Sequence, residues 1–132
     1  MTYVIAEIGS NHQKDIGIAK TLIDISKLAG CDAVKFQIFT HDTLYSKYTP
    51  DFDKYHNICE LIKRLEMPLN FYSDLKAYCD KIQIDFLATP FYDFAVDFLI
   101  DLGVKIIKIA SFEFDDIRFV KYICSKNIPI IA

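Results

Sequence analysis

The stretch Ala33-Val34-Lys35-Phe36-Gln37-Ile38-Phe39 is a short, largely apolar run, which predicts a buried strand. On its amino-terminal side, residues 16–29 carry apolar side chains at helical spacing, and Gly30 ends that pattern. Another apolar run, at residues 3–8, precedes the helical segment. The beginning of the chain therefore predicts a strand, a helix and a second strand.

The same alternation continues along the rest of the chain. A short helix is predicted near residues 58–65, after an irregular stretch around residues 48–51. The later elements are helices at residues 71–82 and 92–102, strands at 85–88 and 105–110, a helix that Asp115 or Asp116 caps and that reaches Ser125, and a strand at 129–132. Apolar strands linked by helices predict a parallel sheet that is covered on its faces and has right-handed crossovers.

Two α/β architectures fit this order of elements: an open doubly wound sheet and part of an eight-stranded (β/α)8 TIM-type barrel. Barrel enzymes place their chemistry at the carboxyl ends of several strands, whereas doubly wound folds concentrate it at one switch point. Here four successive predicted strands carry polar groups at or near their ends: Glu7, Asn11 and His12; Lys35 and Gln37; Thr89; and Lys108, Ser111 and Glu113. The sequence therefore favours a partial TIM-type barrel, with about four βα units plus a fifth strand.

The chain is too short for a whole barrel. A complete barrel takes about 250 residues, and this sequence has 132. We expect a single domain, residues 1–132, that corresponds to the amino-terminal half of such a barrel. It could be a fragment, a truncated gene product or half of an assembly, and its first and last strands would then have unpaired edges that favour association.

Composition narrows the classes of partner. A formal net charge of −3, with both signs interspersed, gives no cationic stripe for nucleic acid or an anionic membrane. The amino terminus has no basic region followed by a long apolar one, and no apolar run approaches the ~20 residues of a membrane span. Four cysteines without a Cys-x-x-Cys pair indicate reduced thiols that serve as packing residues. We expect a cytoplasmic protein that acts on small molecules.

Two lysines interrupt apolar strands, Lys35 in Ala33-Val34-Lys35-Phe36 and Lys108 in Ile106-Ile107-Lys108-Ile109. A buried ammonium is costly unless it has a partner. In a barrel mouth the two lysines would form a site for a phosphate or carboxylate, with Thr89 and Ser111 as neutral donors. The alternative is that each lysine extends from a strand end into solvent, or pairs with a structural carboxylate.

The corresponding acids are Glu7 and Glu113. Each could transfer a proton or bind a sugar hydroxyl, or serve as the ion-pair partner of a strand lysine. For His12, a metal ligand, a phosphate contact and a surface residue all stay open, since no further ligand lies at metal-binding spacing. We expect His41 and His56 at the surface.

Four motifs, in this order, resemble the sialic acid synthase family, which includes N-acetylneuraminate, legionaminate and pseudaminate synthases. They are Ala6-Glu7-Ile8-Gly9-Ser10-Asn11-His12, Lys35-Phe36-Gln37, Ala88-Thr89-Pro90-Phe91 and Lys108-Ile109-Ala110-Ser111-Phe112-Glu113. Each motif alone is weak, but four in order on the expected elements are specific. The resemblance spans essentially the whole chain.

The resemblance implies a reaction and roles for particular residues. Members of the family condense phosphoenolpyruvate with N-acetylmannosamine or a related N-acylated amino sugar and release phosphate. By resemblance, Glu7 is catalytic, assisting proton transfer or positioning the reacting groups, and Glu113 contacts the amino sugar. The phosphoenolpyruvate-binding residues would be Lys35, Gln37, Thr89, Lys108 and Ser111.

The resemblance also implies parts that we do not expect within these 132 residues. The family uses a divalent metal, manganese or magnesium, as a Lewis acid on the sugar aldehyde, and its metal-binding histidines lie on later strands. A carboxy-terminal antifreeze-like domain and a homodimer complete its active site. Gln13-Lys14 replaces a frequent glycine, and Ser111-Phe112-Glu113 is closest to the pseudaminate type, so the sugar stays open. Two alternatives are another phosphoenolpyruvate-aldose condensing enzyme and a non-catalytic half-barrel remnant.

Overall fold

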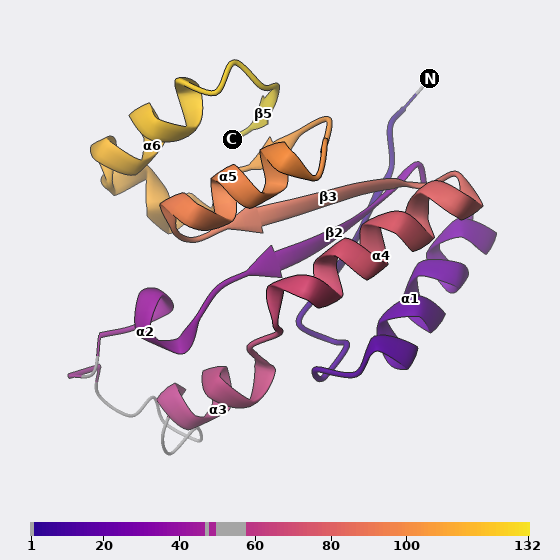
Figure 1. Ribbon diagram of the computed structural model, residues 1–132, viewed down its shortest axis with the longest axis horizontal. Helices are drawn as coiled ribbons and strands as arrows, with labels where there is room; N and C mark the ends of the chain where they lie inside the picture. The colour runs from indigo at the N-terminus through magenta and orange to yellow at the C-terminus, as the bar shows by residue number, and fades with distance from the viewer. Residues whose placement is uncertain (1, 47, 50–57) are drawn as a thin grey trace.

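A computed structural model describes residues 2–46, 48–49 and 58–132 (Figure 1). Within these residues, five parallel strands form a single sheet in the order β1-β2-β3-β4-β5. The strands are β1 (Ile5–Gly9), β2 (Ala33–Ile38), β3 (Asp85–Pro90), β4 (Ile107–Lys108) and β5 (Ile130–Ile131). The predicted α/β fold with a parallel sheet is confirmed.

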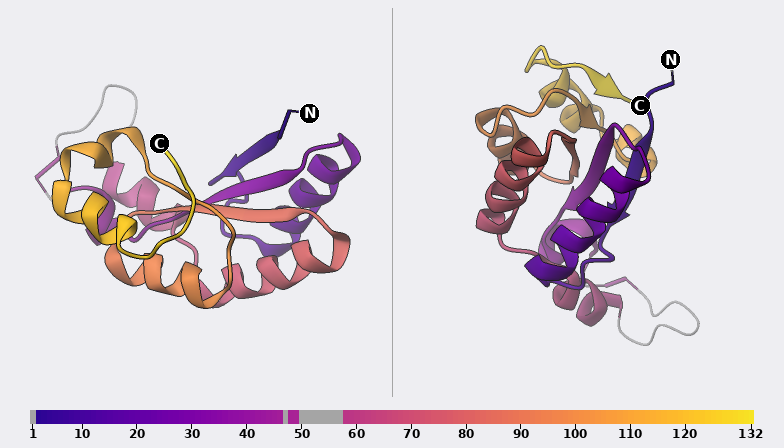
Figure 2. Two further views of the ribbon diagram at one scale, coloured as in Figure 1. Left: turned by 90° about the horizontal axis from the view of Figure 1, so that it is seen from above. Right: turned by 90° about the vertical axis from the view of Figure 1, so that its right-hand side faces the viewer.

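The strand order separates the two architectures that the sequence allowed. Each strand pairs with the next one along the chain, whereas a doubly wound sheet reverses its order at a switch point. Figure 2 shows α1 (Ile16–Leu28), α4 (Leu69–Ile82) and α5 (Asp93–Asp101) along one face of a curved sheet. In the described structure, helices therefore cover only one face of the sheet. This arrangement is the one expected for part of a barrel.

The remaining helices are short. They are α2 (His41–Leu44), α3 (Ile58–Leu65), the 3₁₀ helix η1 (Ser111–Asp115) and α6 (Ile117–Cys124). The helix predicted at residues 58–65 is confirmed, and Asp116 caps α6 by accepting a hydrogen bond from the Phe119 N–H at 3.0 Å. The sequence did not predict α2, and β4 is shorter than the predicted strand 105–110. Pro50, Asp51 and His56 lie outside the described residues.

The core lies between the sheet and its helices. Val34, Phe36 and Ile38 of β2 are fully or almost fully buried and belong to one apolar cluster with side chains of α1, α4 and α5. Since successive side chains of a strand point to opposite faces, the intervening Lys35 and Gln37 point away from the helices. The packing of β2 thus directs its polar residues to the face without helices.

The structure also tests the expectations for the four cysteines and for membrane-spanning helices. Cys31, Cys59, Cys79 and Cys124 are free thiols. Cys79 is buried, which raises its pKa to about 12, whereas Cys124 is exposed and so is not the packing residue that we expected. In the part of the chain that the structure describes, no helix is long and apolar enough to cross a bilayer.

A buried tyrosine ties helix α4 to the site-bearing strand. The Tyr72 hydroxyl donates to the Gln37 carbonyl at 2.7 Å, and Tyr72 is 1% exposed. We predict that Tyr72→Phe lowers the free energy of unfolding by about 1 kcal/mol, because a buried hydrogen bond is lost. Urea denaturation measures this change. Tyr78→Phe is the matched control: its hydroxyl donates to Asp24 at the surface, so little change is expected. Equal losses in both variants would contradict the prediction.

Candidate active site

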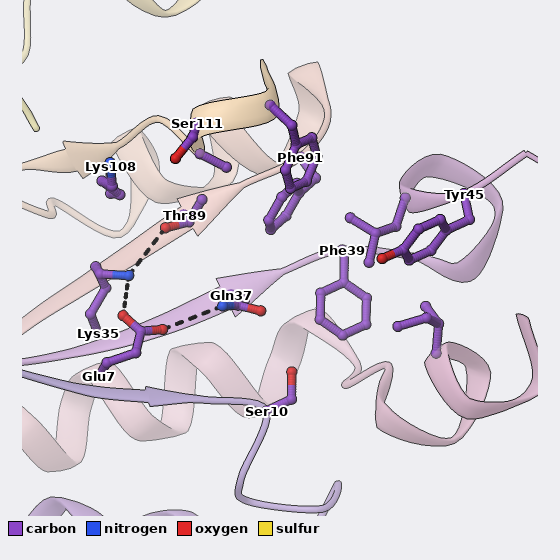
Figure 3. A pocket seen from close by; sticks show the side chains of 14 residues that line it. Glu7, Ser10, Lys35, Gln37, Phe39, Tyr45, Thr89, Phe91, Lys108 and Ser111 are labelled. Atoms are coloured by element: carbon purple, nitrogen blue, oxygen red, sulfur yellow. Dashed lines mark hydrogen bonds and ion pairs between the residues drawn. The ribbon is translucent and has the colours of Figure 1, made fainter. Parts of the chain in front are cut away.

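A cavity of about 400 Å³ opens at the carboxyl ends of strands β1 to β4 (Figure 3). The sheet brings together all but one of the site residues that the sequence predicts. The cavity is lined by Glu7, Lys35, Gln37, Thr89, Lys108 and Ser111. Thr89 was expected just after its strand, but it lies within β3.

Glu113 is the predicted site residue that does not line this cavity. It lies on η1, two positions after Ser111, and its side chain is half-buried. Burial, together with the nearby Asp116 carboxylate, raises the pKa of Glu113. The expected contact between Glu113 and an amino sugar stays a prediction.

An ion pair between Glu7 and Lys35 occupies one side of the cavity. The two residues face each other in the β1–β2 register, so their side chains share a face of the sheet. The Lys35 ammonium also donates to the Thr89 hydroxyl at 3.5 Å, and the Gln37 amide donates to Glu7 Oε1 at 3.4 Å. Four side chains from three strands thus form one connected polar group.

Lys108 adds a second positive charge to the cavity. Its side chain lies at the end of β4, and no carboxylate among the described residues pairs with its ammonium group. Glu7 balances one of the two lysine charges. The lining described here therefore has an excess of positive charge, which favours an anionic ligand.

The backbone just after Glu7 is irregular and passes close to the Glu7 carboxylate. The β1–β2 register shifts between Glu7 and Gly9, and Gly9 has φ +55°, in the left-handed region that favours glycine. A Cβ atom at Gly9 would lie 3.2 Å from Glu7 Oε1 and 3.6 Å from Gln37 Nε2. A side chain at this position would therefore press on the carboxylate and the amide.

Sequence reasoning missed the apolar part of the lining. The residues concerned are Phe39, Leu44, Tyr45, Ile62, Phe91 and Phe112, together with the polar Ser10. Phe39 and Phe91 each follow directly after a strand, which is a signal that could have identified them. The Phe91 and Phe112 rings stack with centroids 5.6 Å apart, although Phe112 is largely exposed.

Comparison with known proteins assigns this arrangement to a family. The NeuB family model matches residues 22–132. The chain belongs to the NeuB family. The predicted resemblance to sialic acid synthases is thereby confirmed.

Several NeuB family relatives match nearly the whole chain. The N,N'-diacetyllegionaminic acid synthase of Legionella pneumophila is 36% identical over 98% of this chain and 38% of its own length. The spore coat polysaccharide biosynthesis protein SpsE of Bacillus subtilis is 36% identical over 98% of this chain and 36% of its own. This chain therefore spans well under half the length of these relatives.

A solved structure supports the same assignment. The crystal structure of N-acetylneuraminic acid (sialic acid) synthetase from Leptospira borgpetersenii, in complex with citrate, superposes with a TM-score of 0.88 at 28% identity. The match covers 97% of this chain and 42% of that one. The described sheet and helices are therefore part of the fold of a NeuB family barrel.

The described residues do not fit the divalent metal that the resemblance implies. Among residues 2–46, 48–49 and 58–132, no group of three His, Cys, Asp or Glu side chains could hold a metal ion. The carboxylate in the cavity, Glu7, is paired with Lys35, whose charge would oppose a cation.

His12 is buried, so the surface position that the sequence left open for it is wrong. It is 1% exposed, lies against Phe36 with ring centroids 6.1 Å apart, and its Nδ1 accepts a hydrogen bond from the Lys14 N–H at 3.0 Å. Burial lowers the pKa of His12. His41 is half-buried instead of exposed, because its Nδ1 and its backbone N–H both lie 2.9 Å from Glu66 Oε2.

The role of the irregular backbone at Gly9 can be tested by replacing each of two glycines with alanine. Gly9 and Gly103 both have positive φ, but a Cβ at Gly103 would meet no atom within 4 Å. We predict that Gly9→Ala and Gly103→Ala each cost about 1 kcal/mol of stability from backbone strain. Only Gly9→Ala should shift the side-chain NMR signals of Lys35, because it displaces Glu7. Unchanged Lys35 signals in Gly9→Ala would contradict this account of Gly9.

Because His12 is buried, we expect the free energy of unfolding to depend on pH. Because the pKa of His12 is lower in the folded chain, the unfolded chain binds a proton first as the pH falls below about 6.5. The free energy of unfolding should therefore decrease between pH 7.5 and pH 5.5. His12→Asn keeps an acceptor for the Lys14 N–H, and its free energy of unfolding should decrease less over this range. Parallel curves for the two proteins would exclude this role for His12.

Proposed function

We propose that this chain provides the phosphoenolpyruvate-binding part of a nonulosonate synthase. The complete enzyme would condense phosphoenolpyruvate with N-acetylmannosamine or a related N-acylated amino sugar and release phosphate. The observation that carries the proposal is the pair of strand lysines, Lys35 and Lys108, in one cavity whose described lining contains one carboxylate, that of Glu7. NeuB family membership, and relatives that are named as synthases of sialic acid type, support it.

The charged lining suits the groups of phosphoenolpyruvate. The ligand carries a carboxylate and a phosphate, and two ammonium groups can each form a charge-assisted hydrogen bond with one of them. Thr89, Ser111 and Gln37 supply neutral donors beside the lysines. Because these groups sit on adjacent strands of one sheet, they hold the ligand without needing to reorganise.

The proposed reaction forms one carbon–carbon bond and one carbon–oxygen bond, and it breaks the carbon–oxygen bond to phosphate. Carbon 3 of phosphoenolpyruvate uses the π electrons of its double bond to attack the aldehyde carbon, and the aldehyde oxygen takes up a proton. Water adds to carbon 2 and gives up a proton, which leaves a hydroxyl group there. Phosphate then leaves from carbon 2 and takes up the proton of that hydroxyl, which gives the keto acid. We assign the positioning of the reacting groups, or the transfer of one of these protons, to Glu7.

The chain alone should bind phosphoenolpyruvate without turning it over. In isothermal titration, Lys108→Ala should weaken phosphoenolpyruvate binding at least about tenfold, because a charge-assisted hydrogen bond is lost. Lys121→Ala, on the exposed surface of α6, is the matched control and should bind like the original chain.

The same samples distinguish the alternatives. Incubated with phosphoenolpyruvate, manganese and N-acetylmannosamine, the chain should form no product. Product formation would refute the claim that the rest of the enzyme is needed. The absence of any binding heat in the original chain would instead favour a non-catalytic half-barrel remnant.

A further inference from the structure

Ser10 lies between two chemically different ends of the cavity (Figure 3). Lys35 and Lys108 lie at the charged end. The apolar end consists of Phe39, Leu44, Tyr45, Ile62 and Phe91. The Ser10 side chain lines the cavity, and its hydroxyl makes no hydrogen bond within residues 2–46, 48–49 and 58–132. In the described structure this hydroxyl is therefore available to a ligand.

Ser10 lies beside the carboxylate and the amide of the charged end. It follows Gly9 directly, and a Cβ atom at Gly9 would lie 3.2 Å from Glu7 Oε1 and 3.6 Å from Gln37 Nε2. The backbone that carries Ser10 thus passes close to two side chains that we assign to the phosphoenolpyruvate site. A serine hydroxyl at this place adds a neutral donor for an anionic ligand.

The loop that carries Ser10, between β1 and α1, is a tight and strained turn. The Ser10 carbonyl accepts a hydrogen bond from the Gln13 N–H at 3.2 Å, and the His12 carbonyl accepts one from the Asp15 N–H at 2.9 Å. Gln13 and Lys14 have φ of +49° and +64°, in the left-handed region that residues with a side chain rarely adopt. Such a conformation persists only where the surrounding contacts hold it.

The buried ring of His12 supplies contacts of this kind. It lies against the Phe36 ring, which belongs to the core between β2 and the helices. Its Nδ1 accepts the Lys14 N–H at 3.0 Å, in the middle of the strained turn. Burial lowers the pKa of His12, which keeps the ring neutral near pH 7 and leaves Nδ1 able to accept. His12 therefore anchors the turn to strand β2.

We propose that His12 is a positioning residue, which holds the turn so that the Ser10 hydroxyl faces the phosphoenolpyruvate site. His12 is not among the residues that line the cavity, so its effect on the ligand passes through Ser10. The connection runs from the Lys14 N–H through Gln13 to the Ser10 carbonyl. This inference rests on the proposed function, because it concerns the binding of the same ligand.

A double-mutant cycle tests whether His12 acts through Ser10. Phosphoenolpyruvate is titrated at pH 7.5 into the original chain, Ser10→Ala, His12→Leu and the double variant. Ser10→Ala should weaken binding about fivefold, which corresponds to one ordinary hydrogen bond. His12→Leu should weaken binding to a similar extent, because the turn relaxes and the hydroxyl moves away. The double variant should bind no more weakly than Ser10→Ala.

Two further variants separate positioning from a general loss of stability. His12→Asn keeps an acceptor for the Lys14 N–H, so it should bind phosphoenolpyruvate more tightly than His12→Leu does. Tyr122→Phe removes a 2.7 Å hydrogen bond from α6 to Asp97 on α5 and should bind like the original chain. Equal weakening in Tyr122→Phe and His12→Leu would overturn the positioning role.

The outcomes separate the inference from the proposed function. If the original chain does not bind phosphoenolpyruvate, both are overturned. If it binds but Ser10→Ala binds equally well, or if the effects of Ser10→Ala and His12→Leu add, only the inference is overturned. If His12→Leu does not fold, His12→Ala takes its place in the cycle, and Ser10→Ala gives its own answer in either case.

Discussion

Alternation along strand β2 imposes the arrangement of the whole site. Val34, Phe36 and Ile38 must face the helices to be removed from water, so Lys35 and Gln37 must face the other way. The Lys35 side chain is only 14% exposed, and an ammonium group so shielded needs partners. The Glu7 carboxylate and the Thr89 hydroxyl, on the two neighbouring strands, provide them.

This constraint links the fold to the chemistry of the cavity. Glu7 reaches Lys35 because the two residues face each other in the β1–β2 register, and Gly9, which has no side chain, leaves room for the carboxylate. Lys108, one strand beyond Thr89, is left without a described carboxylate and gives the cavity its excess positive charge. The site is therefore the polar face of the sheet, closed at one side by the aromatic and aliphatic side chains beside α2 and α3.

Local sequence signals predicted the main elements of the fold and the charged end of the cavity, because these features depend on residues that are close together in the sequence. Apolar runs located the strands, Gly30 and Asp116 marked a helix end and a helix start, and a lysine within an apolar strand marked the charged end. The resemblance added roles that the chain by itself does not supply. NeuB family membership is shown, whereas the roles of Lys35, Lys108 and Glu7 stay predictions.

What the sequence could not predict depends on contacts between distant segments. The apolar end forms only when Phe39 meets Phe91, and α2 has a single turn that Thr40 and Thr43 define. His12 is buried in a turn in which Gln13 and Lys14 both adopt positive φ and the Lys14 N–H donates to its ring. No periodic pattern encodes such a turn.

The central claim is that the anionic substrate binds at the carboxyl ends of β1 to β4. Amide NMR spectra of the chain, titrated with phosphoenolpyruvate, test it most directly. The account predicts shifts concentrated at the residues that line the cavity, from Glu7 on β1 to Ser111 after β4. A second polar cavity, between Tyr3, Asp32 and Asp85, lies at the opposite ends of the strands. Shifts concentrated there, or no shifts at all, would contradict the account.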